Sequence, residues 1–146
     1  MTRSFLVAFI FTLVSLPILA SDDPAKERHE LMEGVKDAAG VIGGMIKGEQ
    51  EFEIKAAMEA LFVWQNAAQK FGHLFPEGTY SGEPDTAKMD VWTDRKGFEE
   101  LLAKFGSQVD DAIGATPQTQ DELAEAAGPI FKTCKQCHEG YRLEGD

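Results

Sequence analysis

Hydrophobic residues recur every three or four positions along four segments of this chain, a spacing that puts them on one face of an α-helix. The segments run from about Lys26 to Lys47, Glu51 to Phe71, Asp94 to Ile113 and Gln120 to Leu143. Each apolar stripe is narrow and heptad-like, as in helices that pack nearly antiparallel. The sequence contains no alternating strand pattern. It therefore predicts an all-α fold, an antiparallel four-helix bundle.

The segments between these helices contain the residues that end helices and form turns. Gly48 and the short link Glu49-Gln50 predict that the second helix returns antiparallel to the first,. Residues 72–93 contain several glycines and prolines and form a crossover too long for a simple hairpin. Gly114 and Pro117 end the third helix,. With no internal repeat, residues 21–146 read as one domain.

The first twenty residues resemble an export signal. Arg3 precedes an apolar stretch from Phe5 to Ala20, which is short for a transmembrane helix of about 20 apolar residues,. We expect cleavage between Ala20 and Ser21, a periplasmic mature protein, and no membrane contact after cleavage. Ile18 is larger than the usual residue three positions before a cut, so an uncleaved anchor stays an alternative.

The chemistry of the chain is concentrated near its C-terminus, in Cys134-Lys-Gln-Cys137-His138. This Cys-x-x-Cys-His spacing is typical of haem c, in which two thiols add to the vinyl groups and the histidine ligates the iron. On a helix all three side chains share one face. They also lie on the stripe that faces the core, so the attached haem would lie within the bundle.

Two other uses of a Cys-x-x-Cys pair remain alternatives. A thiol–disulfide enzyme usually places the pair at the start of a helix that follows a strand, whereas here it lies deep in a C-terminal helix. A zinc site would have to recruit His29 or His73, which lie in polar surroundings and are expected at the surface. Adjacent Cys137 and His138 would also suit a tetrahedral ion poorly.

The chain is acidic, with a formal net charge of −11. Removal of residues 1–20, which hold one arginine and no acid, leaves 126 residues and a charge of −12. Nucleic acid is excluded as a partner class because phosphate binding relies on clusters of lysine and arginine. The charge is explained by a solvated surface, or by steering toward a redox partner protein with a basic surface.

Three stretches resemble the class II cytochromes c, which include cytochrome c′ and its low-spin relatives. They are Cys134-Lys-Gln-Cys-His-Glu-Gly-Tyr-Arg142, Arg28-His-Glu-Leu-Met32 and Phe75-Pro-Glu-Gly-Thr79. The resemblance spans the chain after residue 20 and implies a left-handed four-helix bundle holding one covalent haem c. It also implies that His138 lies below the iron and that Met32 faces the opposite side.

Met32 separates the two functional types of this family. A thioether ligand favours ferrous iron and makes a six-coordinate, low-spin site suited to electron transfer. If Met32 only covers the iron, the site is five-coordinate and binds nitric oxide or carbon monoxide, and methionine is also a common core filler. The segments around Met32 and Phe75 resemble the low-spin members more closely. Arg28 and Arg142, each one helical turn from a proposed ligand, could hydrogen-bond haem propionates or be solvated surface residues,.

The sequence therefore predicts a periplasmic monohaem c-type cytochrome, a one-electron carrier with His138 and Met32 as axial ligands. It is not expected to be an enzyme, because the iron cycles between ferric and ferrous states and no substrate is transformed. A five-coordinate, gas-binding haem protein is the alternative. Either a monomer or a homodimer is compatible with the sequence.

Overall fold

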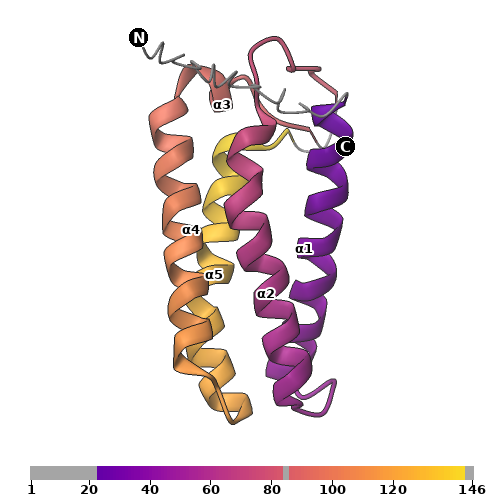
Figure 1. The fold of residues 1–146 in the computed structure, drawn as a ribbon, viewed down its shortest axis with the longest axis vertical. Helices are drawn as coiled ribbons and strands as arrows, with labels where there is room; N and C mark the ends of the chain where they lie inside the picture. The colour runs from indigo at the N-terminus through magenta and orange to yellow at the C-terminus, as the bar shows by residue number, and fades with distance from the viewer. Residues whose placement is uncertain (1–22, 84–85, 144–146) are drawn as a thin grey trace, which may run out of the picture.

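A computed structural model describes residues 23–83 and 86–143 of the chain. Its architecture is built on four long helices, as the hydrophobic spacing predicts (Figure 1). These are α1 (Pro24–Ile46), α2 (Ile54–Phe71), α4 (Arg95–Ala115) and α5 (Gln120–Tyr141). The predicted signal peptide and its cleavage site lie outside the described residues and stay predictions.

The four helices form an antiparallel bundle. Helix α1 packs against α2 and α5, and α4 packs against α2 and α5, so the four close into a ring (Figure 1). This confirms the all-α bundle. In the part of the chain that the structure describes, no helix is both long enough and apolar enough to cross a membrane.

Local hydrogen bonds and backbone geometry fix the ends of the helices. The Asp23 carboxylate accepts hydrogen bonds from the backbone N–H groups of Ala25 and Lys26 at the start of α1, at 3.1 and 3.0 Å,. The Thr119 hydroxyl caps α5 in the same way, through the N–H of Glu122 at 3.2 Å. After α1, Gly48 has φ +72°, a left-handed conformation that glycine adopts without strain,.

The crossover between α2 and α4 carries two short elements that the hydrophobic pattern does not predict. A 3₁₀ turn, η1 (Gly72–Leu74), extends α2, and a four-residue helix, α3 (Asp90–Thr93), precedes α4. Val91 of α3 is buried, and the indole N–H of Trp92 donates to the carbonyl of Pro76 at 3.0 Å. The crossover therefore folds over the upper end of the bundle in Figure 1.

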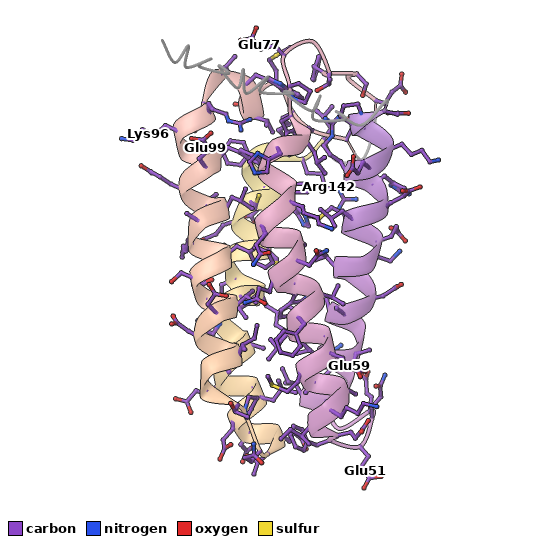
Figure 2. The ribbon with its side chains drawn as sticks, in the orientation of Figure 1. Glu51, Glu59, Glu77, Lys96, Glu99 and Arg142 are labelled. Atoms are coloured by element: carbon purple, nitrogen blue, oxygen red, sulfur yellow. The ribbon has the colours of Figure 1, made fainter. Side chains whose placement is uncertain are left out.

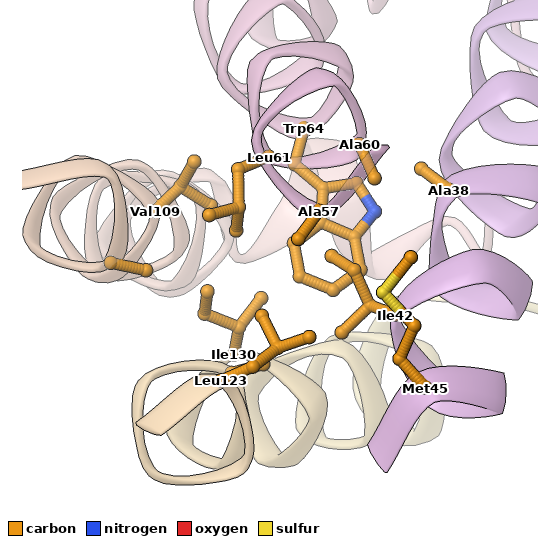
Figure 3. Close-up of a cluster of buried hydrophobic side chains, with 12 residues drawn as sticks. Ala38, Ile42, Met45, Ala57, Ala60, Leu61, Trp64, Val109, Leu123 and Ile130 are labelled. Atoms are coloured by element: carbon orange, nitrogen blue, oxygen red, sulfur yellow. The ribbon is translucent and has the colours of Figure 1, made fainter. Parts of the chain in front are cut away.

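The buried side chains form two clusters, one above the other in the orientation of Figure 1. The lower cluster, shown in Figure 3, contains Ala38, Ile42, Met45, Ala57, Ala60, Leu61, Trp64, Val109, Ala112, Leu123, Ala127 and Ile130. The upper cluster contains Leu74, Phe75, Val91, Phe98 and Tyr141, under the crossover. The hydrophobic core is thus divided at one level along the bundle axis.

Candidate functional site

The last turns of α5 carry the Cys-x-x-Cys-His motif, and the two thiols lie on the level that divides the core. Cys134 is half-buried and packs against the lower cluster. Cys137, three residues on, is half-buried and packs against the upper cluster. His138 follows on the same helix and is exposed. Helical spacing puts all three side chains on neighbouring positions of one face.

The end of α5 is held in place by the crossover and by α4. The phenol of Tyr141 donates a hydrogen bond of 2.7 Å to a carboxylate oxygen of Asp94, at the start of α4. The Tyr141 carbonyl accepts from the N–H of Lys88 at 2.9 Å, and the N–H of Leu143 donates to the carbonyl of Thr86 at 2.8 Å. Three contacts from residues far away in the sequence therefore set the position of the motif in the bundle.

Both thiols are held in their protonated form. Burial raises the pKa of Cys134, and it raises the pKa of Cys137 to about 11, with the nearby Cys134 adding to the effect. Redox-active Cys-x-x-Cys pairs have the opposite property, a thiol pKa lowered by a helix N-terminus or a nearby cation. The site is therefore poorly suited to thiol–disulfide exchange.

All three histidines of the chain are accessible to solvent. His29 of α1 and His73 of η1 are exposed, as the sequence predicts. His138 is also accessible to solvent, yet its pKa is lowered, first by desolvation from the atoms packed around it and then by the charge of Arg142. A lowered pKa keeps the imidazole neutral, which is the form that ligates a metal. Among the described residues, no three His, Cys, Asp or Glu side chains are grouped as a metal site would need.

Met32 lies on α1 at the level of the cysteine pair. Its neighbour Leu31 packs against the upper cluster, and Val35, one turn on, packs against the lower cluster. Met32 is half-buried between these two positions. Since α1 and α5 pack against each other, Met32 and the cysteine pair lie on neighbouring helices, near the level at which the core divides. Ligation of a haem iron by Met32 and His138 stays a prediction.

Arg28 has a role that the sequence analysis missed. Its guanidinium is buried and donates to the carbonyl of Leu74 at 2.7 Å, to the hydroxyl of Thr79 at 3.2 Å and to the carbonyl of Thr79 at 3.1 Å. It also lies 4.8 Å from the centre of the Phe75 ring,. Arg28 therefore fastens the crossover to α1, and its contact with a propionate stays a prediction.

Arg142 follows α5 as its C-cap, and its N–H donates to the carbonyl of His138 at 3.1 Å. Its side chain is exposed, and its charge acts on the His138 imidazole. Its predicted bond to a propionate stays a prediction.

The sequence profile of the family described as Cytochrome C′ matches residues 23–142. The chain belongs to the cytochrome c′ family. This confirms the resemblance drawn from the three motifs, and the match includes all four long helices. Members of the family carry one covalently bound haem c, are typically periplasmic and are generally not enzymes. Cys134 and Cys137, the only two cysteines of the chain, are consistent with that attachment.

Relatives of both functional types resemble the chain. Cytochrome c-556 of Rhodopseudomonas palustris is 30% identical over 146 residues, which cover 97% of each chain. Cytochrome c′ of the same organism is 26% identical over 138 residues, 94% of each chain. A solved structure of cytochrome c′ from Rhodopseudomonas palustris has a TM-score of 0.80 at 25% identity and covers 86% of this chain and 100% of that one. These names do not separate the two types.

Proposed function

We propose that this protein is a periplasmic one-electron carrier in which His138 and Met32 are the axial ligands of a haem attached to Cys134 and Cys137. The observation that carries the proposal is the shared level of Met32 and the cysteine pair, where the core divides into two clusters. When bound, the haem supplies an iron that alternates between ferric and ferrous states. No substrate is transformed.

The residues of this chain would serve that function by holding the ligands still. The Tyr141–Asp94 and Lys88–Tyr141 hydrogen bonds fix the end of α5, and with it His138. The Arg28 contacts fix the crossover against α1, one turn from Met32. A site whose ligands move little between oxidation states exchanges electrons with little reorganisation, which suits a carrier. A soft thioether ligand would also raise the reduction potential.

A five-coordinate, gas-binding protein is the second candidate. It is favoured by the relatives named cytochrome c′, which match the chain over nearly its whole length. In that case Met32 would fill space beside the iron without binding it.

Carbon monoxide binding to the ferrous holoprotein tests the choice. We expect the wild-type protein to bind carbon monoxide weakly, because Met32 must first leave the iron, and Met32→Ala to bind it much more tightly. Met58→Ala is the matched control, since Met58 of α2 is also half-buried but packs against the lower cluster. Wild-type protein that binds as tightly as Met32→Ala would contradict the proposal.

A further inference from the structure

The negative charge of this protein is concentrated at one end of the bundle. Residues 46–60 and 106–126 form the lower end in Figure 1, and we call them the acidic end. They hold nine carboxylates and two lysines, a net charge of −7, out of −8 for all the described residues. Glu51 and Glu59 mark this end in Figure 2, and charges of both signs, Arg142, Lys96, Glu77 and Glu99, are labelled toward the other end. The remainder of the described chain, which includes the cysteine pair, is therefore nearly neutral.

Within that nearly neutral part, four lysines surround the outward face of the last turns of α5. Lys132 and Lys135 lie on α5 itself and are exposed. Lys104 of α4 donates to the side-chain oxygen of Gln136 at 3.1 Å, and Lys88 of the crossover donates to the carbonyl of Glu139 at 2.7 Å. We call Lys88, Lys104, Lys132 and Lys135 the lysine face.

Three carboxylates lie near these lysines. Asp94 accepts a hydrogen bond from Tyr141 at the end of α5, and Asp90 follows Lys88 by two residues. Glu139 is 3.6 Å from the ammonium group of Lys135, and both side chains are largely exposed. From Gly128 to Tyr141, Glu139 is the only acidic residue of α5. With these three carboxylates and the exposed Arg142, the lysine face and its surroundings carry a charge of +2, although the protein as a whole is strongly negative.

The distance between the acidic end and the lysine face decides which of the two charges acts on a partner that binds near the cysteine pair. Glu125, the carboxylate of the acidic end nearest to the lysine face on α5, precedes Lys132 by seven residues, which corresponds to about 10 Å along the helix axis,. Charges in physiological salt are screened over about 8 Å. A partner that touches the lysine face therefore experiences mainly its positive charge. A basic partner would be drawn to the acidic end, away from Cys134, Cys137 and His138.

We propose that the lysine face is the docking surface for a redox partner whose own docking surface is rich in carboxylates. This rests on the proposed electron-carrier function. It differs from the partner with a basic surface that net charge alone suggests, because the charge that matters is the charge next to the attachment site. Oppositely charged patches speed encounter and orient the two proteins.

Ferricyanide, a small multiply charged anion, is the probe that tests the sign of this surface. One electron passes from the ferrous holoprotein to ferricyanide, which leaves ferric protein and ferrocyanide. We measure the second-order rate constant as ionic strength rises from about 100 mM to about 1 M, a range over which the screening length falls from about 10 to about 3 Å. The rate should fall with added salt, as for opposite charges. If net charge controlled the reaction, the rate would rise with salt.

Two matched double variants test whether the lysine face is responsible for the reaction rate with ferricyanide. Lys132→Gln with Lys135→Gln should lower the low-salt rate roughly three- to tenfold, from the loss of two charges at close range in water. Lys47→Gln with Lys55→Gln removes the same charge from the acidic end and should change the rate by less than twofold. Mass spectrometry verifies that every variant retains its haem.

Two outcomes would overturn the docking surface: a wild-type rate that rises with salt, or equal effects of the two double variants. The ferric spin state, recorded on the same samples, reports separately on the proposed function. If the wild-type protein were high-spin and its rate still fell with salt, the electron-carrier function would be wrong, and with it the docking of a redox partner. The positive charge of the lysine face would still be supported.

Discussion

The hydrogen bond between Tyr141 and Asp94 should contribute measurably to stability, and Tyr141→Phe removes it while keeping the ring. The ring is 9% exposed and packs edge-on against Phe98, with the ring centres 5.5 Å apart. The same Asp94 carboxylate caps α4 through the N–H of Gly97 at 3.2 Å. Loss of the phenol therefore frees the end of α5 without emptying the upper cluster.

The size of the effect follows from the pKa of Tyr141, which is raised to about 12, first by the hydrogen bond to Asp94 and then by desolvation. A shift from 10 to 12 corresponds to at most about 3 kcal/mol in favour of the neutral phenol. Asp94 is exposed, so water screens the interaction and resolvates the carboxylate in the variant,. We therefore expect the free energy of unfolding to fall by about 1 kcal/mol.

The stability that the Tyr141–Asp94 hydrogen bond contributes should fall at high pH. A group whose pKa is raised in the folded state stabilises it fully below the unfolded pKa, here about 10, and loses that contribution as pH rises toward 12,. The difference between wild type and Tyr141→Phe should therefore be constant from neutral pH to about 10 and shrink above it.

Denaturant unfolding of the holoprotein at several pH values measures this difference. Tyr80→Phe is the control, because Tyr80 is the only other tyrosine and is 41% exposed. The reasoning would be refuted if Tyr141→Phe were as stable as wild type at pH 7, or if the difference did not shrink above pH 10.

Three further predictions concern the site and its supports. Arg28→Ala should lower the free energy of unfolding by about 2–4 kcal/mol, because it leaves the buried carbonyl of Leu74 without its donor, and denaturant unfolding measures the loss,. His138→Ala should change the visible spectrum strongly while His29→Ala and His73→Ala leave it nearly unchanged; similar effects of all three would refute the ligand assignment. Acid–acetone extraction should leave the haem on the protein, and release of the haem would contradict attachment through two thioethers.

The long helices were predictable because each must bury one stripe of side chains, and the three- or four-residue spacing of apolar residues identifies that stripe. Their ends were less so: α2 begins at Ile54, three residues after the predicted Glu51, and no side chain caps it. The elements η1 and α3 have three and four residues, too short for a periodic signal. They are stabilised by tertiary contacts such as that of Trp92 with Pro76.

Part of the candidate site could likewise be predicted from the sequence, and part of it could not. Cys134, Cys137 and His138 are adjacent in sequence, so their shared face follows from helical spacing alone. The partners of Arg28 lie 46 and 51 residues away and those of Tyr141 lie 47 away, so only the packed bundle brings them together. One signal was available for Arg28: a charged residue one turn before Met32, on a helix face that is otherwise apolar.

The near-infrared absorption and spin state of the ferric wild-type holoprotein at neutral pH test the central claim most directly. If Met32 ligates the iron, the protein should show the weak sulfur-to-iron charge-transfer band and a low-spin paramagnetic signal. Met32→Ala should lose the band, become high-spin and have a lower reduction potential, because a soft ligand that favours ferrous iron is gone. Wild-type protein that is already high-spin, and unchanged by Met32→Ala, would contradict the electron carrier and favour the gas-binding protein.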